Sequence, residues 1–348
     1  MSALRLFLLP LSLVYGAVVF VRNWFFDIGL LPVTKVAVPV ISVGNILVGG
    51  TGKTPLVEYL ARLLQQHGKK VAIISRGYRR TTKGYVVVSN GAQRCAEASE
   101  SGDEPAQMAE KLDGVVVVVD ENRVRAAQRV VKDFRVNAII LDDGFQHRYL
   151  HRHLDLVVVT AEETTSFMPL LPAGNRRETL ASLQRADAVV VSRWRHAEDL
   201  AQARRVLERW NKPVVGMSLH PTMLVHAASR RHEELSTIKG KNAVAFSGIG
   251  QPEAFDWTLQ SLAVNVVQHH RFPDHYRFRP RDIEEVIESY KRSQAEYILT
   301  TEKDLVRLAG DGTVSQSFFQ EFPVFAVQVG AVIDEKEIFH EIVQKALA

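Results

Sequence analysis

The chain contains almost no cysteine, with only Cys95 among its 348 residues. One cysteine cannot form an internal disulfide or a zinc site built from thiolates, and its scarcity suits a reducing compartment. Glycine and proline are also few, at 21 and 13 residues, which excludes a collagen-like or low-complexity chain. Because 46% of the residues are hydrophobic, burial can offset the entropy lost on ordering, so most of the chain is expected to fold.

The excess of positive charge is small. Lysine and arginine number 43 against 39 aspartate and glutamate residues, a net charge of +4. This balance favours anionic partners such as phosphates, nucleic acid or acidic lipid, without choosing among them. The length favours two domains over one.

An apolar run from Leu6 to Val21 lies near the N-terminus. As a helix it is about 24 Å long at ~1.5 Å per residue, short of the ~30 Å hydrocarbon thickness of a bilayer. Bulky residues follow it in place of the small residues of a cleavage site, which argues against a signal peptide. A short span and a helix packed on its own domain stay open as alternatives. The flanking Arg5 and Arg22 favour a helix at residues 1–27 that dips into one leaflet of a membrane.

Apolar strands and amphipathic helices alternate from residue 28 to residue 212. Five consecutive valines, Val115–Val119, indicate a strand that is buried on both faces. The alternation implies right-handed βαβ units and a parallel sheet covered on both faces. The expected strands are residues 38–43, 71–75, 115–119, 138–141, 156–160 and 188–192, and the expected helices are residues 55–66, 105–111, 124–134 and 200–210.

The alternation stops at residues 213–236, which contain two prolines and no long periodic run, so we place a linker there. It restarts in residues 237–348, which we interpret as a smaller α/β domain. The expected strands of that domain are residues 243–247, 264–268, 297–300 and 324–329, and its expected helices are residues 253–262, 281–290 and 336–347.

A glycine-rich loop lies between the first expected strand and the first expected helix. It reads Gly49, Gly50, Thr51, Gly52, Lys53 and Thr54. Glycines let successive N–H groups curl around a phosphate, and the helix N-terminus adds partial positive charge. Lys53 can reach the β- and γ-phosphates of a nucleotide, and the Thr54 hydroxyl can bind Mg²⁺. The usual spacing has glycine where this chain has Leu47, but the glycines at 49 and 50 leave room for the same turn.

These features predict an α/β fold: a parallel-sheet domain like that of P-loop nucleoside triphosphatases at residues 28–212, followed by the smaller domain. Asp142 and Asp143 end an apolar strand of the first domain. Ligands of open α/β sheets bind at the carboxyl ends of the strands, where a carboxylate can hold Mg²⁺. Without the phosphate loop, the same residues would indicate only a turn.

The nucleotide is ATP by default. Partition-type switch ATPases have an additional lysine where this chain has Val48, and the Asn-Lys-x-Asp motif that reads guanine is absent. Its nearest counterpart, Thr301-Glu302-Lys303-Asp304, has the wrong order. A membrane-bound nucleotide switch and a soluble kinase or ligase of the same loop class stay open, although Val48 weighs against the first and the apolar N-terminus against the second.

A set of short motifs in a fixed order resembles the tetraacyldisaccharide 4′-kinases (lipid A 4′-kinases) of Gram-negative bacteria. The motifs run nearly end to end: Val43–Asn45, Gly49–Pro55, Ser75–Tyr78, Gly102–Pro105, Asp142–Arg148, Leu171–Gly174, Gly248–Gly250, Phe272–Tyr276 and Thr301–Asp304. One segment departs from the family pattern Gly-Pro-Leu-Arg-Glu-Pro, because residues 174–179 read Gly-Asn-Arg-Arg-Glu-Thr. A substrate role for Arg177 or Glu178 is therefore less secure.

The resemblance implies a reaction and a place. ATP would donate its γ-phosphoryl group to the 4′-hydroxyl of an acylated glucosamine disaccharide 1-phosphate during lipid A biosynthesis. The family works on the cytoplasmic side of the bacterial inner membrane, so the expected partners are that lipid and the membrane surface, with no nucleic acid and no obligate protein partner. Two lobes joined by a small β linker would close over the nucleotide.

Three residues are the candidates for catalysis. Lys53 would neutralise charge on the transferred group. His275, which follows Asp274 in a turn-like run, would act as general base on the alcohol. The resemblance suggests Asp103 as the carboxylate that orients His275 from the first domain. Alternatively, Asp103 only supports a helix cap and His275 is a surface turn residue.

A further set of residues is expected to bind the disaccharide and its 1-phosphate, since arginine suits phosphate and polar groups suit sugar hydroxyls. This set comprises Asn45, Arg76, Tyr78, Glu104, Arg123, Gln146 and His147. An alternative interpretation of Arg76 and its basic neighbours Arg79, Arg80 and Lys83 is a solvated basic face, and these residues could also attract anionic lipid.

Overall fold

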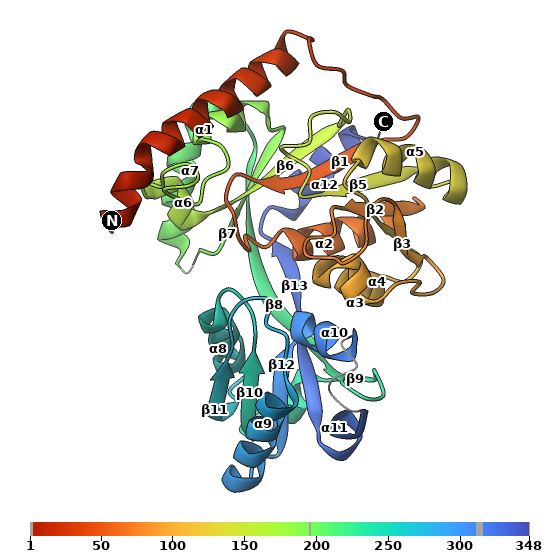
Figure 1. Ribbon diagram of the computed structural model, residues 1–348, viewed down its shortest axis with the longest axis vertical. Coiled ribbons are helices and arrows are strands. Elements are labelled where there is room, and N and C mark those ends of the chain that lie inside the picture. The colour runs from red at the N-terminus through yellow and green to blue at the C-terminus, as the bar shows by residue number, and fades with distance from the viewer. Residues whose placement is uncertain (1–2, 195, 311–315, 348) are drawn as a thin grey trace.

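The structure is a computed structural model that describes residues 3–194, 196–310 and 316–347. Two lobes follow one another along the long axis, and a long helix, α1 (Ala3–Asp27), lies along the outside of the first lobe (Figure 1). The first lobe contains β1 (Val40–Asn45), α2 (Lys53–Gln66), β2 (Val71–Ser75), β3 (Val86–Asn90), α3 (Ala98–Ser101), α4 (Asp103–Lys111), β4 (Val116–Val119), α5 (Arg123–Phe134), β5 (Ala138–Asp142), β6 (Leu154–Thr160), α6 (Ala161–Thr165), β7 (Ala188–Ser192) and α7 (Ala197–Leu207).

The second lobe is the smaller one. Its elements are the C-terminal part of β8 (Val214–His226), β9 (His232–Glu233), β10 (Asn242–Ser247), α8 (Pro252–Ser261), β11 (Asn265–Arg271), α9 (Pro280–Ser293), β12 (Tyr297–Thr301), α10 (Glu302–Gly310), α11 (Gln316–Glu321) and the N-terminal part of β13 (Val324–Ile333). The chain then ends in α12 (Lys336–Lys345).

The sheet of the first lobe is buried on both faces. Its strands lie in the order β7-β6-β1-β5-β2-β4-β3, and all neighbours are parallel except β3 and β4. Ile73 packs toward α2, whereas the next residue, Ile74, packs toward α5. Because helices cover both faces, the strands need apolar side chains at every position. The buried Val116–Val119 confirms this expectation for the valine run.

The pairing of β1 and β5 positions the site. Val43 of β1 lies opposite Asp142 of β5 in a parallel register. The loop that follows β1 and the acidic end of β5 therefore share one edge of the sheet, the carboxyl edge at which open α/β folds bind ligands.

The segment predicted to be a linker has regular structure. Residues 214–226 form β8, which pairs with β7 at its start and runs antiparallel to β13 along its length. The two strands pass from one lobe to the other, so the sheet path is continuous through the molecule (Figure 1). Polar and apolar residues are mixed in this segment because it crosses between two environments, and that mixture concealed the strand.

The C-terminal helix returns to the first lobe. Phe339 and Val343 of α12 are buried in the same core as Leu56 of α2 and Ile140 of β5. The end of the expected second domain at residue 348 is thus corrected: β13 leads the chain back, and α12 belongs to the first lobe. Its amphipathic pattern predicts a helix but does not say which lobe the helix covers.

A buried ionic cluster joins the two lobes. Lys111 of α4 lies 2.8 Å from Glu58 of α2 and 3.0 Å from Glu302 of α10, and its ammonium group also donates to the carbonyl of Val329 at 2.7 Å. All three charged side chains are less than 10% exposed. Burial raises the pKa of Glu302 to about 7, against the opposing attraction of Lys111. One lysine therefore bridges two carboxyl groups from different lobes, and the raised pKa of Glu302 limits the negative charge that its single positive charge must balance.

Replacing this lysine should destabilise the protein. In Lys111→Met, two buried carboxylates face each other without a cation, so the free energy of unfolding in urea at pH 7.5 should fall by about 3–5 kcal/mol. The loss should shrink as the pH falls, because protonation in the folded state removes the unpaired charges. Lys345→Met, which removes an exposed pair with Glu341, is the matched control and should leave the urea midpoint unchanged. Equal midpoints for both variants would contradict the role assigned to Lys111.

Candidate functional site

The phosphate loop coils between β1 and α2. Gly49 and Gly52 have φ angles of 120° and 89°, a region that glycine adopts with little strain. Thr51 is buried and fixed from two strands: Asn45 Nδ2 donates to its hydroxyl at 3.1 Å, and Ser192 Oγ donates to its carbonyl at 2.7 Å. The ends of β1 and β7 thereby determine the shape of the loop. A helix N-terminus that follows such a coil suits a phosphate group.

Lys53 and Thr54 open α2 directly after this coil. The ammonium group of Lys53 lies 3.4 Å from Asp143 Oδ1, and the guanidinium of Arg177 donates to Asp143 Oδ2 at 2.7 Å. Although burial alone would raise it, the charges of Lys53 and Arg177 hold the pKa of Asp143 near 2. Asp143 is therefore ionised and links the loop lysine to a second cation.

The neighbouring carboxylate, Asp142, is in the opposite electrostatic situation. It is buried, and Ser75 Oγ donates to its Oδ2 at 2.8 Å, but its Oδ1 has no hydrogen-bond donor. Burial and then the negative charges of Glu104 and Asp143 raise the pKa of Asp142 to about 7. Two adjacent carboxylates thus differ widely in proton affinity, and the one without a cation would gain from a bound cation.

The donor set fits Mg²⁺ only in the presence of a nucleotide. Among residues 3–194, 196–310 and 316–347, no group of three or more His, Cys, Asp or Glu side chains is arranged to hold a metal. A hydroxyl from Thr54 and an undonated oxygen of Asp142 supply hard oxygen ligands, which Mg²⁺ prefers, but the remaining ligands must come from phosphate and water.

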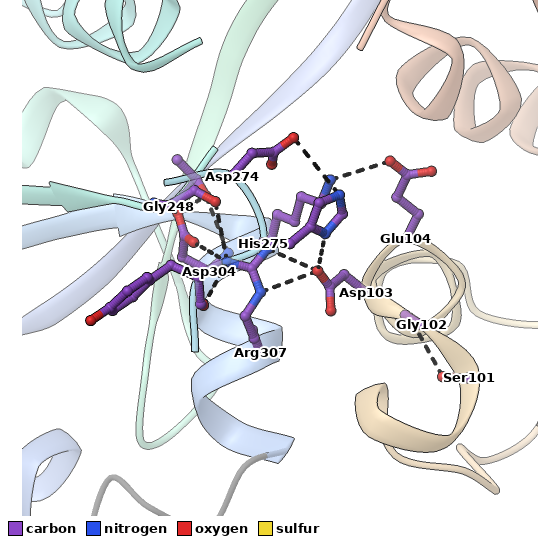
Figure 2. A network of polar contacts seen from close by, with 12 residues as sticks. Ser101, Gly102, Asp103, Glu104, Gly248, Asp274, His275, Asp304 and Arg307 are labelled. Atoms are coloured by element: carbon purple, nitrogen blue, oxygen red, sulfur yellow. Dashed lines mark hydrogen bonds and ion pairs between the residues drawn. The ribbon is translucent and has the colours of Figure 1, made fainter. Parts of the chain in front are cut away.

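Two predicted residues meet across the lobes. His275 Nδ1 donates to Asp103 Oδ2 at 2.9 Å, so the second lobe contacts the first residue of α4 (Figure 2). His275 has a φ of 59°, and its backbone N–H donates to the carbonyl of Gly248 at 3.1 Å. Its ring also meets the ring of Tyr78 edge-on, at 5.7 Å between centroids. The contact between the predicted partners is present, and their roles stay predictions.

The first turn of α4 connects this pair to the phosphate loop. Asp103 faces His275, while the next residue, Glu104, is close enough for its charge to raise the pKa of Asp142. Lys303 of the second lobe pairs with Glu104 at 3.3 Å. One helical turn thus reaches both the imidazole and the carboxyl edge of the central strands.

The other predicted substrate residues divide into two groups. Arg123 and His147 each keep a buried ring or guanidinium nitrogen without a hydrogen-bond partner. Burial, followed by the charge of Arg123, lowers the pKa of His147 to about 4, so it is neutral at pH 7. Arg76 and Tyr78 are exposed. These four side chains are available to a ligand.

Asn45 and Gln146 are engaged within the protein. Asn45 is fully buried and holds Thr51, and Gln146 Nε2 donates to the carbonyl of Asn45 at 2.8 Å. One nitrogen of each thus supports the phosphate loop, while Asn45 Oδ1 and Gln146 Oε1 keep no hydrogen-bond partner, and their contact with the sugar stays a prediction.

Sequence reasoning missed or doubted several residues here. Arg177, doubted because its segment departs from the family pattern, pairs with Asp143, whereas Glu178 binds Arg185 and Asn23. Arg193 was missed, and its guanidinium lies 3.3 Å from the position that a Cβ at Gly50 would take. It directly follows the end of β7, and that place in the chain is the signal that could have found it.

Comparisons with known proteins show the family of this chain. The family model described as tetraacyldisaccharide-1-P 4′-kinase (LpxK) matches residues 4–348. The tetraacyldisaccharide 4′-kinase of Chlorobaculum parvum is 38% identical over 315 residues, which cover 89% of this chain and 86% of that protein. The crystal structure of LpxK from Aquifex aeolicus in complex with ATP aligns with a TM-score of 0.80 and 34% identity, covering 99% of this chain and 100% of that one. From the loop, the paired lobes and these relatives together, the chain belongs to the tetraacyldisaccharide 4′-kinase family.

Proposed function

We propose that this kinase transfers the γ-phosphoryl group of ATP, with Mg²⁺, to the 4′-hydroxyl of a tetraacyl glucosamine disaccharide 1-phosphate at the cytoplasmic face of the bacterial inner membrane. The observation that carries the proposal is a phosphate loop on one lobe together with an imidazole–carboxylate pair that spans both lobes. Phosphoryl transfer needs alignment and neutralised charge more than covalent chemistry, and this arrangement supplies both.

The donor site neutralises the triphosphate. The loop amides and the N-terminus of α2 hold the phosphates, and Lys53 leaves its pair with Asp143 to contact the β- and γ-phosphates. Thr54, Asp142 and Asp143 are the residues that would hold Mg²⁺, which when bound neutralises charge developing between the β- and γ-phosphates. Arg193, beside Gly50, adds a further positive charge at the loop.

The acceptor is activated by His275. Because Nδ1 donates to Asp103, the lone pair of the ring is on Nε2, where it can take the proton of the 4′-hydroxyl. The sugar oxygen forms a bond to the γ-phosphorus as the bond from that phosphorus to the bridging oxygen of ADP breaks. Asp103 keeps the tautomer fixed and stabilises the imidazolium that results.

The 1-phosphate is bound away from the reacting hydroxyl. Arg123 and Arg76 offer guanidinium groups, and neutral His147 offers a ring nitrogen that has no partner in the protein. Among the predicted substrate residues, Tyr78 packs its ring against His275 and Glu104 follows Asp103 in α4, so both suit contacts to the sugar. The lipid would therefore lie across the first lobe, with its 4′-end toward the second.

In this proposal, helix α1 contacts the acyl chains of the lipid and the membrane surface. Its 21-residue segment Phe7–Asp27 is long and apolar enough to cross a bilayer, and most of it is exposed. The polar face of α1 is tied to the lobe, since Ser12 donates to the carbonyl of Leu170 at 2.9 Å and Tyr15 to that of Arg177 at 3.1 Å. The opposite face presents Phe7, Leu13 and Phe20, each more than 70% exposed. A helix held along one side favours lying in the interface over spanning.

Removing the loop lysine should abolish turnover. Lys53→Met should lower label transfer from γ-labelled ATP to the lipid by at least about 10²-fold, because the transferred charge loses its closest cation. Circular dichroism should show a folded protein. Lys345→Met serves as the control and should transfer label at the parental rate. Near-normal transfer by Lys53→Met would remove the loop from the mechanism.

Removing the imidazole should affect the chemical step. His275→Ala should lower kcat by about 10²–10⁴-fold while the KM for ATP changes little, because the base does not contact the nucleotide. His232→Ala, at an exposed histidine of β9, is the matched control. An unchanged single-turnover rate for His275→Ala would assign the base to another group.

The exposed face of α1 should govern binding to membranes. The double variant Leu13→Asp and Phe20→Asp should sediment less with vesicles of anionic phospholipid, and its thermal midpoint should hold because both side chains are exposed. Val267→Asp, at an exposed apolar position of the far lobe, is the control. Unchanged sedimentation of the double variant would show that α1 is not the membrane contact.

A further inference from the structure

The motif Thr301–Asp304 has no part in the mechanism above, although it starts the helix that faces the catalytic pair. In the structure it forms the end of β12 and the first turn of α10. Helix α10 lies against α4, so three of its charged side chains meet opposite charges on that helix. The pairs are Glu302 with Lys111, Lys303 with Glu104, and Arg307 with Asp103.

Arg307 makes the densest set of contacts in this group. It is 5% exposed, and its Nε and Nη2 donate to Asp103 Oδ2 at 3.1 and 2.8 Å (Figure 2). Its Nη1 lies 2.9 Å from Asp304 Oδ1 and within 3.3 Å of the carbonyl oxygens of Gly248 and Tyr276. The guanidinium is thus held in the second lobe by three acceptors and directs its other edge at the first lobe.

Asp304 fixes the arginine in turn. It is fully buried, and its Oδ2 accepts hydrogen bonds from the Thr301 hydroxyl at 2.6 Å and from the backbone N–H of Gly248 at 3.0 Å. Its other oxygen pairs with Arg307. The first and last residues of the motif therefore form a socket for the guanidinium of the arginine that follows three residues after Asp304.

The same atoms that hold Arg307 also hold the catalytic pair. Asp103 Oδ2 accepts from His275 Nδ1 as well as from two nitrogens of Arg307. The carbonyl of Gly248 accepts from Nη1 of Arg307 and from the backbone N–H of His275. Each lobe therefore has one oxygen, Asp103 Oδ2 in the first and the Gly248 carbonyl in the second, that accepts hydrogen bonds from both the arginine and the histidine.

We propose that Arg307 is a positioning residue for phosphoryl transfer, which holds the Asp103 carboxylate ionised and aimed at His275 when the two lobes are together. The proposal rests on the proposed roles of His275 and Asp103. Without Arg307, Asp103 would keep one donor from the second lobe and could turn away from the ring. Burial raises the pKa of Asp103, and the hydrogen bond from His275 together with the charge and bonds of Arg307 lowers it to about 2, which agrees with this role.

Only arginine satisfies the socket. Two of its nitrogens meet Asp103 while a third meets three acceptors of the second lobe, and a lysine ammonium cannot span both sets. Arg307→Lys should therefore keep the charge and lose the orientation. Arg307→Met should lose both.

The variants are tested in the full chain by kcat, by the KM for ATP and by the pH profile of kcat. Arg307→Met should lower kcat about 10–100-fold with little change in the KM for ATP, and Arg307→Lys should lie between it and the parent. Arg230→Met is the matched control, because Arg230 makes another arginine–carboxylate pair between the second lobe and α4, with Glu110 at 2.9 Å. It should retain the parental kcat.

The pH profile separates positioning from general stability. His275 faces Asp103 and Tyr78 from the first lobe, Asp274 at 3.8 Å on its own loop, and Arg307 and Lys303 on α10 by way of Asp103. Loss of the guanidinium leaves the charge of Asp103 unbalanced, which favours the protonated imidazole. The acidic limb of the kcat profile should therefore move to higher pH in Arg307→Met and stay in place in Arg230→Met.

A double-mutant cycle identifies the group through which Arg307 acts. In an Asp103→Asn background, Arg307→Met should cost less than about threefold in kcat, because the carboxylate it positions is already gone. Additive losses, or a parental kcat and acidic limb in Arg307→Met, would overturn the proposal. Should Arg307→Met melt early, the same cycle with Arg307→Lys decides. A parental kcat in Asp103→Asn alone would instead contradict the proposed function.

Discussion

The hydrogen bond between Asp103 and His275 is the contact on which the site depends. It joins residues from different lobes at 2.9 Å, and each lobe brings only half of the pair. The bond forms because β8 and β13 run continuously between the lobes and because α10 lies along α4. The pair that we propose as the general base and its orienting carboxylate is therefore formed only when the two lobes are in this contact, which would couple the proposed chemistry to the relative position of the lobes.

Charge complementarity explains how so many ionised groups share this region. Asp143 has Lys53 and Arg177 as partners, Asp103 has Arg307, and Lys111 serves Glu58 and Glu302. Asp142 alone among these carboxylates has a donor only from Ser75, and its pKa is raised to about 7. That local excess of negative charge stands at the carboxyl edge beside the phosphate loop, which is where a cation accompanying a triphosphate would restore the balance.

Sequence reasoning predicted the regular parts of the fold and failed where long-range contacts decide. Continuous apolar runs indicated the strands of the first lobe, and the phosphate loop was found because glycine, lysine and threonine have defined roles at fixed spacing. The strand β8 was not predicted because its side chains face two environments. The packing of α12 on the first lobe was not predicted because an amphipathic pattern indicates a helix but not the surface against which that helix packs. Arg307 carries no local signal, since its meaning depends on Asp103, about two hundred residues earlier.

Helix α1 is connected to the phosphate loop by a short chain of polar contacts. Its polar face hydrogen-bonds the segment that contains Leu170 and Arg177, and Arg177 in turn donates to Asp143, the carboxylate next to the loop lysine. Only two residues, Arg177 and Asp143, therefore separate α1 from Lys53. A lipid whose acyl chains lie along the exposed face of α1 would have its sugars over the same segment. The departure from the family pattern at residues 174–179 falls in this connection, and Arg177 keeps its contact with Asp143 despite it. The altered segment thus keeps both contacts of Arg177, its backbone carbonyl with Tyr15 of α1 and its guanidinium with Asp143 beside the phosphate loop, and neither contact uses one of the changed side chains.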